Sequence, residues 1–206
     1  MAKNEKKKGM NLPNKITCIR LIVAVIVLVI LCMPWSAIGV EWKRYSLKGF
    51  SQDIDLKFIV AGVLFAIGSF TDFLDGFIAR KYNLVTDFGK VMDAIADKIL
   101  VNGVLIILAT EGYISVIIPV VIVSRDIIVD SIKMVAGQKN GAVGASYAGK
   151  VKTAFMMVGI TLLFFYNLPF SLINIYPAEV IIMIATILSV ISGVQYYIKN
   201  KKYLSK

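Results

Sequence analysis

The chain contains no histidine, so it lacks the side chain that most often serves as a general base or binds transition metals. Any base must therefore be a carboxylate, a lysine or a tyrosine. Its two cysteines, Cys18 and Cys32, lie 14 positions apart on one predicted helix, about 21 Å at 1.5 Å per residue, too far for a disulfide. Linkers rich in proline, glycine or serine are missing too, and we expect a single domain over residues 1–206.

Charged residues are scarce, at 17%, whereas apolar residues reach 58% and the mean hydropathy is +0.77. This balance indicates an integral membrane protein and argues against a soluble enzyme. A hydrocarbon core of about 30 Å is crossed by about 20 helical residues. Apolar runs of that length lie near residues 17–38, 57–79, 88–110, 113–136, 151–174 and 177–198. We therefore expect an all-α integral membrane protein with six transmembrane helices and a short interfacial N-terminal segment at 11–17, where Asn14 or Thr17 would cap the first helix.

Acidic residues are outnumbered 13 to 23 by lysine and arginine, which gives a net charge of +10. The basic residues gather before the first predicted helix, around every second link and at the end of the last helix. With an even number of spans these positions share one side, the cytoplasm by the positive-inside rule. We expect a multi-pass protein of a bacterial inner or plasma membrane with both termini cytoplasmic. Attraction to anionic membrane lipids explains these lysines more simply than nucleic acid, which we do not expect as a partner.

Four aspartates interrupt two of the apolar runs: Asp72, Asp75, Asp93 and Asp97. An aspartate at the centre of a membrane helix costs roughly 2.5–3.5 kcal/mol and usually marks an ion or substrate site. The helical period places each pair on one face. Antiparallel helices joined by the short link 81–86 would bring the two faces together near the cytoplasmic surface, where like charges need a cation between them. Oxygen ligands suit Mg²⁺, Mn²⁺ or Ca²⁺, so we expect a divalent-metal site of one or two ions.

From Asp72 to Asp97 the chain reads Asp-x2-Asp-Gly-x2-Ala-Arg-x8-Gly-x3-Asp-x3-Asp. This stretch resembles the signature of the CDP-alcohol phosphotransferase family at all eight fixed positions. The resemblance implies a membrane enzyme, usually a homodimer, that transfers a phosphatidyl or similar group from a CDP-linked donor to an alcohol and releases CMP. It also implies two Mg²⁺ or Mn²⁺ ions held by the four aspartates, with Asp97 acting in addition as the catalytic base. The implied donor-binding residues are Asp72, Gly76, Ala79, Arg80 and Gly89, although Gly89 equally suits helix packing.

Outside this motif the chain resembles the bacterial branch of the family whose donor is CDP-diacylglycerol and whose acceptor is sn-glycerol 3-phosphate. Stretches that carry this likeness include residues 11–17, 124–126 and 149–153. An acceptor with its own phosphate needs fixed cations beside the metal site. The candidates for binding this phosphate are Arg125, Lys133, Lys150 and Lys152. Each residue also has a simpler alternative role. Arg125 could form an ion pair with Asp126 or Asp130, and the lysines could anchor the helices at the membrane surface.

Two alternative functions also fit the sequence. Within the same family the acceptor would differ, as in a cardiolipin synthase or a phosphatidylinositol-phosphate synthase. From another class, a divalent-cation transporter also places carboxylates in membrane helices. A transporter would spread acidic residues across the depth of the membrane, whereas here four aspartates cluster beside Arg80, as a diphosphate requires. The sequence therefore favours the transferase.

Overall fold

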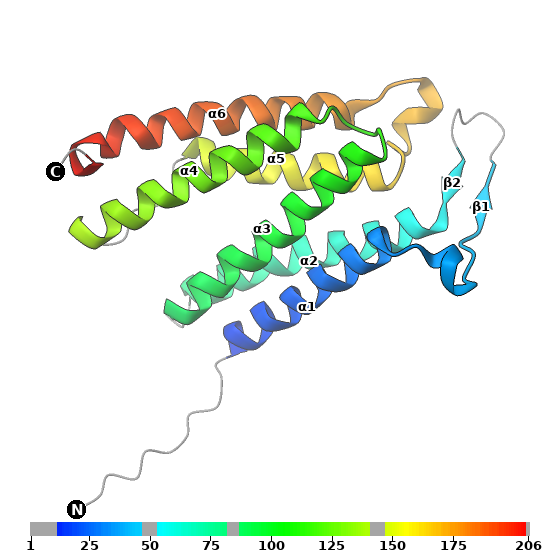
Figure 1. The fold of residues 1–206 in the computed structure, drawn as a ribbon, viewed down its shortest axis with the longest axis horizontal. Coiled ribbons are helices and arrows are strands. Elements are labelled where there is room, and N and C mark those ends of the chain that lie inside the picture. The colour runs from blue at the N-terminus through cyan, green and yellow to red at the C-terminus, as the bar shows by residue number, and fades with distance from the viewer. Residues whose placement is uncertain (1–11, 47–52, 82–86, 141–146, 205–206) are drawn as a thin grey trace, which may run out of the picture.

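The structure is a computed structural model of the chain that describes residues 12–46, 53–81, 87–140 and 147–204. Six α-helices run up and down along one long axis (Figure 1). They are α1 (Leu12–Cys32), α2 (Leu56–Lys81), α3 (Asp87–Thr110), α4 (Ile117–Asn140), α5 (Tyr147–Phe164) and α6 (Pro177–Leu204). Between α1 and α2 lie a 3-10 helix, η1 (Trp35–Ile38), and two antiparallel strands, β1 (Arg44–Tyr45) and β2 (Ile54–Asp55). A second 3-10 helix, η2 (Phe170–Ile173), precedes α6.

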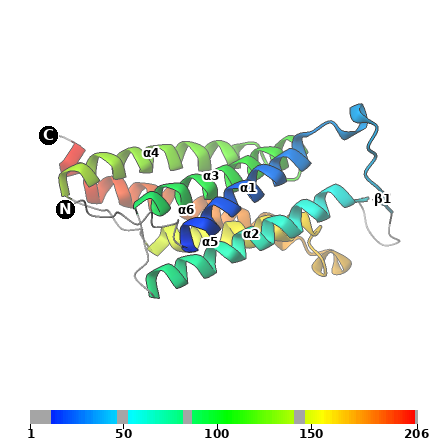
Figure 2. The ribbon, with the colours of Figure 1, turned by 90° about the horizontal axis from the view of Figure 1, so that it is seen from below.

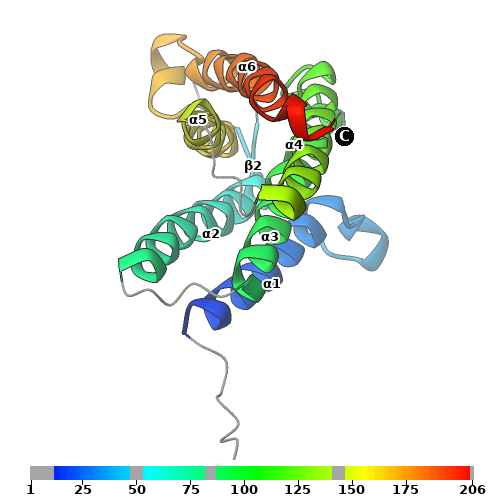
Figure 3. The ribbon, with the colours of Figure 1, turned by 90° about the vertical axis from the view of Figure 1, so that its left-hand side faces the viewer.

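The helices form two groups that follow the order of the chain. In the first group α1 packs against both α2 and α3, and in the second α6 packs against both α4 and α5. Contacts of α2 with α5 and of α3 with α4 join the groups, which Figure 3 shows end-on. We call the end that holds the starts of α1, α3 and α5 and the ends of α2, α4 and α6 the charged end. The strands extend beyond the opposite end, which we call the hairpin end (Figure 2).

Local hydrogen bonds explain where several helices begin and end. The side chain of Asp55 accepts a 2.8 Å hydrogen bond from the backbone N–H of Lys57 and so caps the start of α2. The start of α6 is capped from a distance, because the Asn167 side chain accepts a 2.9 Å bond from the N–H of Ala178. Helix α1 ends two residues before Pro34, which cannot continue a helix.

Three sequence-based boundaries were wrong. Asn14 or Thr17 was predicted to cap the first helix, but α1 already includes Leu12, so both residues lie inside the helix and not at its cap. Pro13 permits this start because a missing N–H costs nothing in a first turn. The run 17–38 ends as a helix at Cys32, and the run 151–174 ends at Phe164. Tyr166 and Asn167 adopt positive φ angles just beyond that point, which stops α5.

The apolar core occupies the half of the bundle near the hairpin end. Five aromatic rings pack together in it, with neighbouring centroids 5.1 to 6.5 Å apart, from Phe58, Phe65, Tyr113, Phe164 and Tyr166. The half near the charged end is different, because its buried polar side chains include two charged ones, Arg20 and Lys152. The others are Thr17, Ser189, Ser192 and Asn200. Among the described residues, charged side chains are thus buried in this half only.

Large apolar side chains also cover the outside of the helices. Ile22 on α1, Ile127 on α4 and Val180 on α6 are each more than half exposed, as side chains that face lipid would be. Within the described residues, three segments are long and apolar enough to cross a membrane: Lys15–Cys32, Tyr147–Phe164 and Pro177–Lys201. The all-α membrane fold is thus confirmed. The count of six spans stays a prediction.

Candidate active site

The described aspartates of the motif lie together at the charged end of the first helix group. Asp72 lies on α2, and Asp93 and Asp97 lie one turn apart on α3. The Asp72 side chain is 28% exposed and the Asp93 side chain 52% exposed, so both can be reached by water. The predicted approach of the two acidic faces is therefore present, but a third helix takes part in it.

Arg20 of α1 connects the two faces. Its guanidinium pairs with Asp72 through Nη1 and with Asp93 through Nη2, and the residue is only 3% exposed. The sequence pattern alone placed Arg20 among the basic residues that open the first helix and among those that resemble the bacterial branch, but not as a partner of the aspartates. An arginine three residues after Thr17, inside an apolar helix, was the available signal, since intramembrane charges usually have a partner.

Other residues of the motif are only partly visible. Asp75, Gly76, Ala79 and Arg80 lie in the last turns of α2, and their side chains are outside the described part of the structure. The link 82–86 is outside it as well. Gly89 lies in the first turn of α3 and is partly buried. The roles assigned to these residues stay predictions.

The arrangement fits a divalent cation. Carboxylates from two helices converge on one cationic group, the Arg20 guanidinium, so a cation at this place is within reach of both. The ligands are all oxygens, as Mg²⁺ and Mn²⁺ prefer. The described residues alone do not complete a group of three potential ligands, and the side chain of Asp75 is not among them.

Asp97 lies near both this carboxylate pair and a second charged cluster. The charges of Arg20 and Asp93 act on it, and so do those of Lys152 and Asp126. Among the described residues, no side chain donates a hydrogen bond to Asp97 or forms an ion pair with it. Its carboxylate thus stands beside both clusters without being tied to either.

The second cluster joins α4, α5 and α6 around the Asp126 carboxylate. One oxygen of Asp126 accepts 2.9 Å hydrogen bonds from Arg125 and from Lys152. Arg125 also donates to the Ser189 carbonyl at 3.0 Å and to the Ser192 hydroxyl at 2.6 Å, which ties α4 to α6. Two of the four predicted acceptor-binding residues, Arg125 and Lys152, are therefore brought together beside Asp97.

The other two candidates do not bind the Asp126 carboxylate in the described part of the structure. Lys133 is 4.0 Å from the Asp130 carboxylate and 5.3 Å from the centre of the Tyr196 ring. Lys150 is exposed at the start of α5. The structure adds a residue that sequence reasoning missed, because Lys98, next to Asp97, forms an ion pair with Asp130. The sequence feature that could have pointed to Lys98 is its position directly after Asp97, the last aspartate of the motif.

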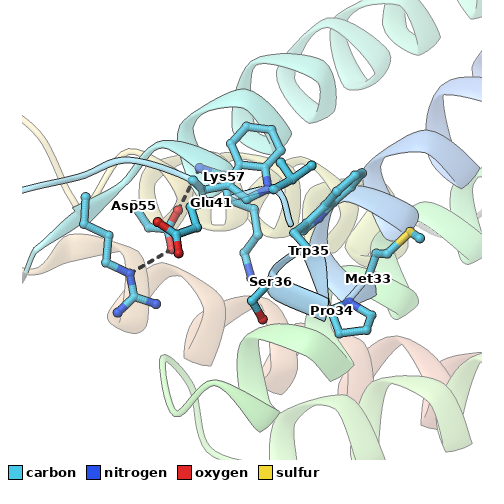
Figure 4. A pocket seen from close by; sticks show the side chains of 10 residues that line it. Met33, Pro34, Trp35, Ser36, Glu41, Asp55 and Lys57 are labelled. Carbon is cyan, nitrogen blue, oxygen red and sulfur yellow. Dashed lines mark hydrogen bonds and ion pairs between the residues drawn. The ribbon is translucent and has the colours of Figure 1, made fainter. Parts of the chain in front are cut away.

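A pocket of about 380 Å³ lies at the other end of the molecule (Figure 4). Its lining includes Trp35 and Trp42, whose rings meet edge to face at 5.8 Å, and an ion pair of 3.5 Å between Arg44 and Asp55. No residue of the aspartate motif lines it. The pocket is therefore separate from the candidate active site.

Comparison with known proteins supplies the family. A sequence model of the CDP-alcohol phosphatidyltransferase family matches residues 10–192. The CDP-diacylglycerol–glycerol-3-phosphate 3-phosphatidyltransferase of Bacillus subtilis is 36% identical over 190 residues, which cover 92% of this chain and 95% of the relative. The Rickettsia felis protein of the same name is 32% identical over 194 residues, covering 94% and 97%.

A solved structure supports the same fold. The crystal structure of Mycobacterium tuberculosis phosphatidylinositol phosphate synthase with CDP-DAG bound aligns with a TM-score of 0.56, over 91% of this chain and 85% of that one. At 19% identity this similarity concerns the fold alone. The sequence relatives confirm the prediction of a phosphatidyltransferase of phospholipid biosynthesis over that of a cation transporter. The chain belongs to the CDP-alcohol phosphatidyltransferase family.

Proposed function

We propose that this enzyme transfers the phosphatidyl group of CDP-diacylglycerol to sn-glycerol 3-phosphate, giving phosphatidylglycerophosphate and CMP. The main support for this proposal is sequence similarity, over nearly the whole chain, to relatives that are named for this activity. The buried cation Lys152, whose charge acts on Asp97, also supports it, because an acceptor that carries a phosphate needs positive charge to bind that phosphate.

The donor would bind at the aspartates. Asp72, Asp75, Asp93 and Asp97 would hold two Mg²⁺ or Mn²⁺ ions. When bound, such ions neutralise a diphosphate and stabilise the charge that develops on the leaving group. Gly76 and Ala79 would leave room for the nucleotide against α2, and Arg80 would offer its planar guanidinium to a phosphate oxygen. Gly89 would allow close approach of the donor to the start of α3.

Asp97 would accept the proton of the attacking hydroxyl. The hydroxyl oxygen of the acceptor forms a bond to the phosphorus that carries diacylglycerol, and the bond from that phosphorus to the CMP oxygen breaks. The electron pair of the broken bond leaves with CMP. The position of Asp97 near both clusters suits this role, since the base must reach the acceptor while the donor lies on the aspartates.

The acceptor phosphate would bind at the second cluster. Arg125 and Lys152 would offer their positive charges to this phosphate, which would share them with the Asp126 carboxylate. Lys133 and Lys150 would extend this positive region toward the membrane surface.

We also propose that the charged end faces the cytoplasm and that the enzyme is a homodimer. The basic residues at this end support the orientation by the positive-inside rule. The family resemblance supports the dimer. Cysteine labelling from each side of sealed vesicles tests the first, and the mass of the detergent-solubilised protein tests the second.

The deciding experiment is a panel of acceptors. The purified protein would be supplied with Mg²⁺ and CDP-diacylglycerol, and CMP release would be measured with glycerol 3-phosphate, phosphatidylglycerol, inositol phosphate, serine and no acceptor. We expect release only with glycerol 3-phosphate. Release with another alcohol but not with glycerol 3-phosphate would contradict the proposed acceptor and leave the family assignment intact.

A further inference from the structure

Arg20 has no part in the proposed reaction, yet it is the most buried of the described charged residues at the carboxylate site. It is 3% exposed, and its two terminal nitrogens pair with Oδ1 of Asp72 and Oδ1 of Asp93. One side chain of α1 thus holds a carboxylate of α2 and a carboxylate of α3. Arg20 occupies the electrostatic position that a divalent ion would take between the same two groups.

The carboxylates need such a cation because they come from different helices. Two negative charges at short distance repel strongly where water is partly excluded. Asp97, one turn along α3, adds a third negative charge that already interacts with Arg20. The guanidinium supplies an opposite charge from within the chain, so the site does not depend on a bound ion to hold its helices together.

Two observations indicate that this pairing can be exchanged for another. The Nε atom of Arg20 is buried and has no hydrogen-bond partner in the part of the chain that the structure describes, so the guanidinium is not fully satisfied where it lies. The Asp93 side chain is 52% exposed, so a hydrated ion can approach it from solvent. Arg20 is therefore a partner that a second cation can displace.

We propose that Arg20 is an internal counter-ion that competes with divalent metal for Asp72 and Asp93. In the metal-free protein it keeps the two carboxylates together, and a bound divalent ion takes over their oxygens. Arg20 thus weakens metal binding and stabilises the metal-free protein. This inference rests on the divalent-metal site of the proposed function.

The test measures Mn²⁺ binding and thermal unfolding of the full chain in detergent or lipid nanodiscs. Arg20→Gln removes the charge, and Arg44→Gln is the matched control, because Arg44 is an exposed arginine at the hairpin end. Free Mn²⁺ is followed by electron paramagnetic resonance. We expect Arg20→Gln to bind Mn²⁺ about tenfold more tightly, since a repelling charge beside the ion is gone. We expect it to unfold at a lower temperature in EDTA and to recover that difference when Mn²⁺ is saturating.

Arg20→Lys provides a second variant. It keeps the positive charge but lacks the planar fork that binds two carboxylates at once, so we expect Mn²⁺ binding only about threefold tighter than in the unchanged protein. If Arg20→Gln cannot be isolated in folded form, this variant decides the question alone.

Unchanged or weaker Mn²⁺ binding in the Arg20 variants would overturn the inference, because Arg20 would then shape the carboxylates for the metal and not compete with it. Arg44→Gln should match the unchanged protein in both measurements. Failure of the proposed metal site itself would look different. The unchanged protein would then bind no Mn²⁺, and both proposals would fall together.

Discussion

The ammonium of Lys152 on α5 lies 2.9 Å from the Asp126 carboxylate on α4, and both side chains are largely buried. The Asp126 oxygen that accepts this bond also accepts one from Arg125. The lysine is thus held in place by an anion, and an acceptor phosphate would have to share it with that anion. Asp126 positions the charge of Lys152, whereas Lys152 itself would bind the substrate. Substitutions at the two residues therefore test two different effects.

Lys152→Gln should raise the KM for glycerol 3-phosphate by about tenfold or more, because a charge-assisted hydrogen bond to phosphate is lost. The KM for CDP-diacylglycerol should change little. Initial rates of CMP release, with each substrate varied in turn, measure both constants. Lys199→Gln is the matched control, since this exposed lysine lies near the end of α6. An unchanged acceptor KM in Lys152→Gln would remove this residue from the acceptor site.

Asp126→Asn should destabilise the protein by about 3 kcal/mol, because buried Lys152 and partly buried Arg125 lose their shared counter-ion. Asp130→Asn on the same helix is the comparison, as the Asp130 side chain is 42% exposed and surface ion pairs contribute at most about 1 kcal/mol. Unfolding of both variants in the same detergent, followed by circular dichroism, measures the difference. Equal stabilities would mean that the buried pair contributes no more than the exposed one.

Asp97→Asn should lower turnover by about 10²- to 10⁴-fold, the usual contribution of a general base, while CDP-diacylglycerol still binds. Asp72→Asn should instead weaken donor binding. CMP release and binding of labelled CDP-diacylglycerol distinguish the two effects. Glu179→Gln, an exposed change at the hairpin end, should affect neither. If Asp97→Asn loses donor binding as severely as Asp72→Asn, the main role of Asp97 is metal ligation.

Gly62→Ala should destabilise the contact between α2 and α5 by about 1–3 kcal/mol, because overpacking a tight interface forces backbone shifts. A Cβ atom at Gly62 would lie 2.5 Å from the Cβ atom of Phe164. Gly137→Ala on α4 has no neighbour within 4 Å and should be neutral or stabilising by up to about 1 kcal/mol. Thermal unfolding of the two variants side by side tests this. A stable Gly62→Ala protein would show that the helices separate easily there.

The helices and the motif faces could be predicted from sequence because both follow from periodicity. The apolar runs predict six helices, and the spacing of Asp93 and Asp97 predicts a shared face whatever the tertiary packing. The two-residue strands β1 and β2 could not be predicted, since so short a strand carries no alternating pattern. The end of α5 was missed because left-handed residues such as Tyr166 are set by tertiary contacts and not by local preference.

The candidate site, too, could be predicted from the sequence only in part. Its aspartates were found because charges stand out within apolar runs. Arg20 was missed because an arginine near a helix start has the same pattern whether it anchors the helix at the membrane surface or pairs with a carboxylate inside the bundle. Only the packing of α1 against both α2 and α3 decides between these roles. Likewise, the ion pair between Lys152 and Asp126 depends on how α4 and α5 pack, which helical spacing within α4 does not reveal.

The division of the bundle into an aromatic half and a charged half has a consequence for how the helices can part. Water and ions can replace contacts among the charged groups, so the helices can part at that end without leaving polar atoms unsatisfied. The close-packed rings around Phe164 offer no such replacement, because a gap there leaves atoms without neighbours. Parting of the helices at the charged end would therefore leave the packed rings at the hairpin end in place.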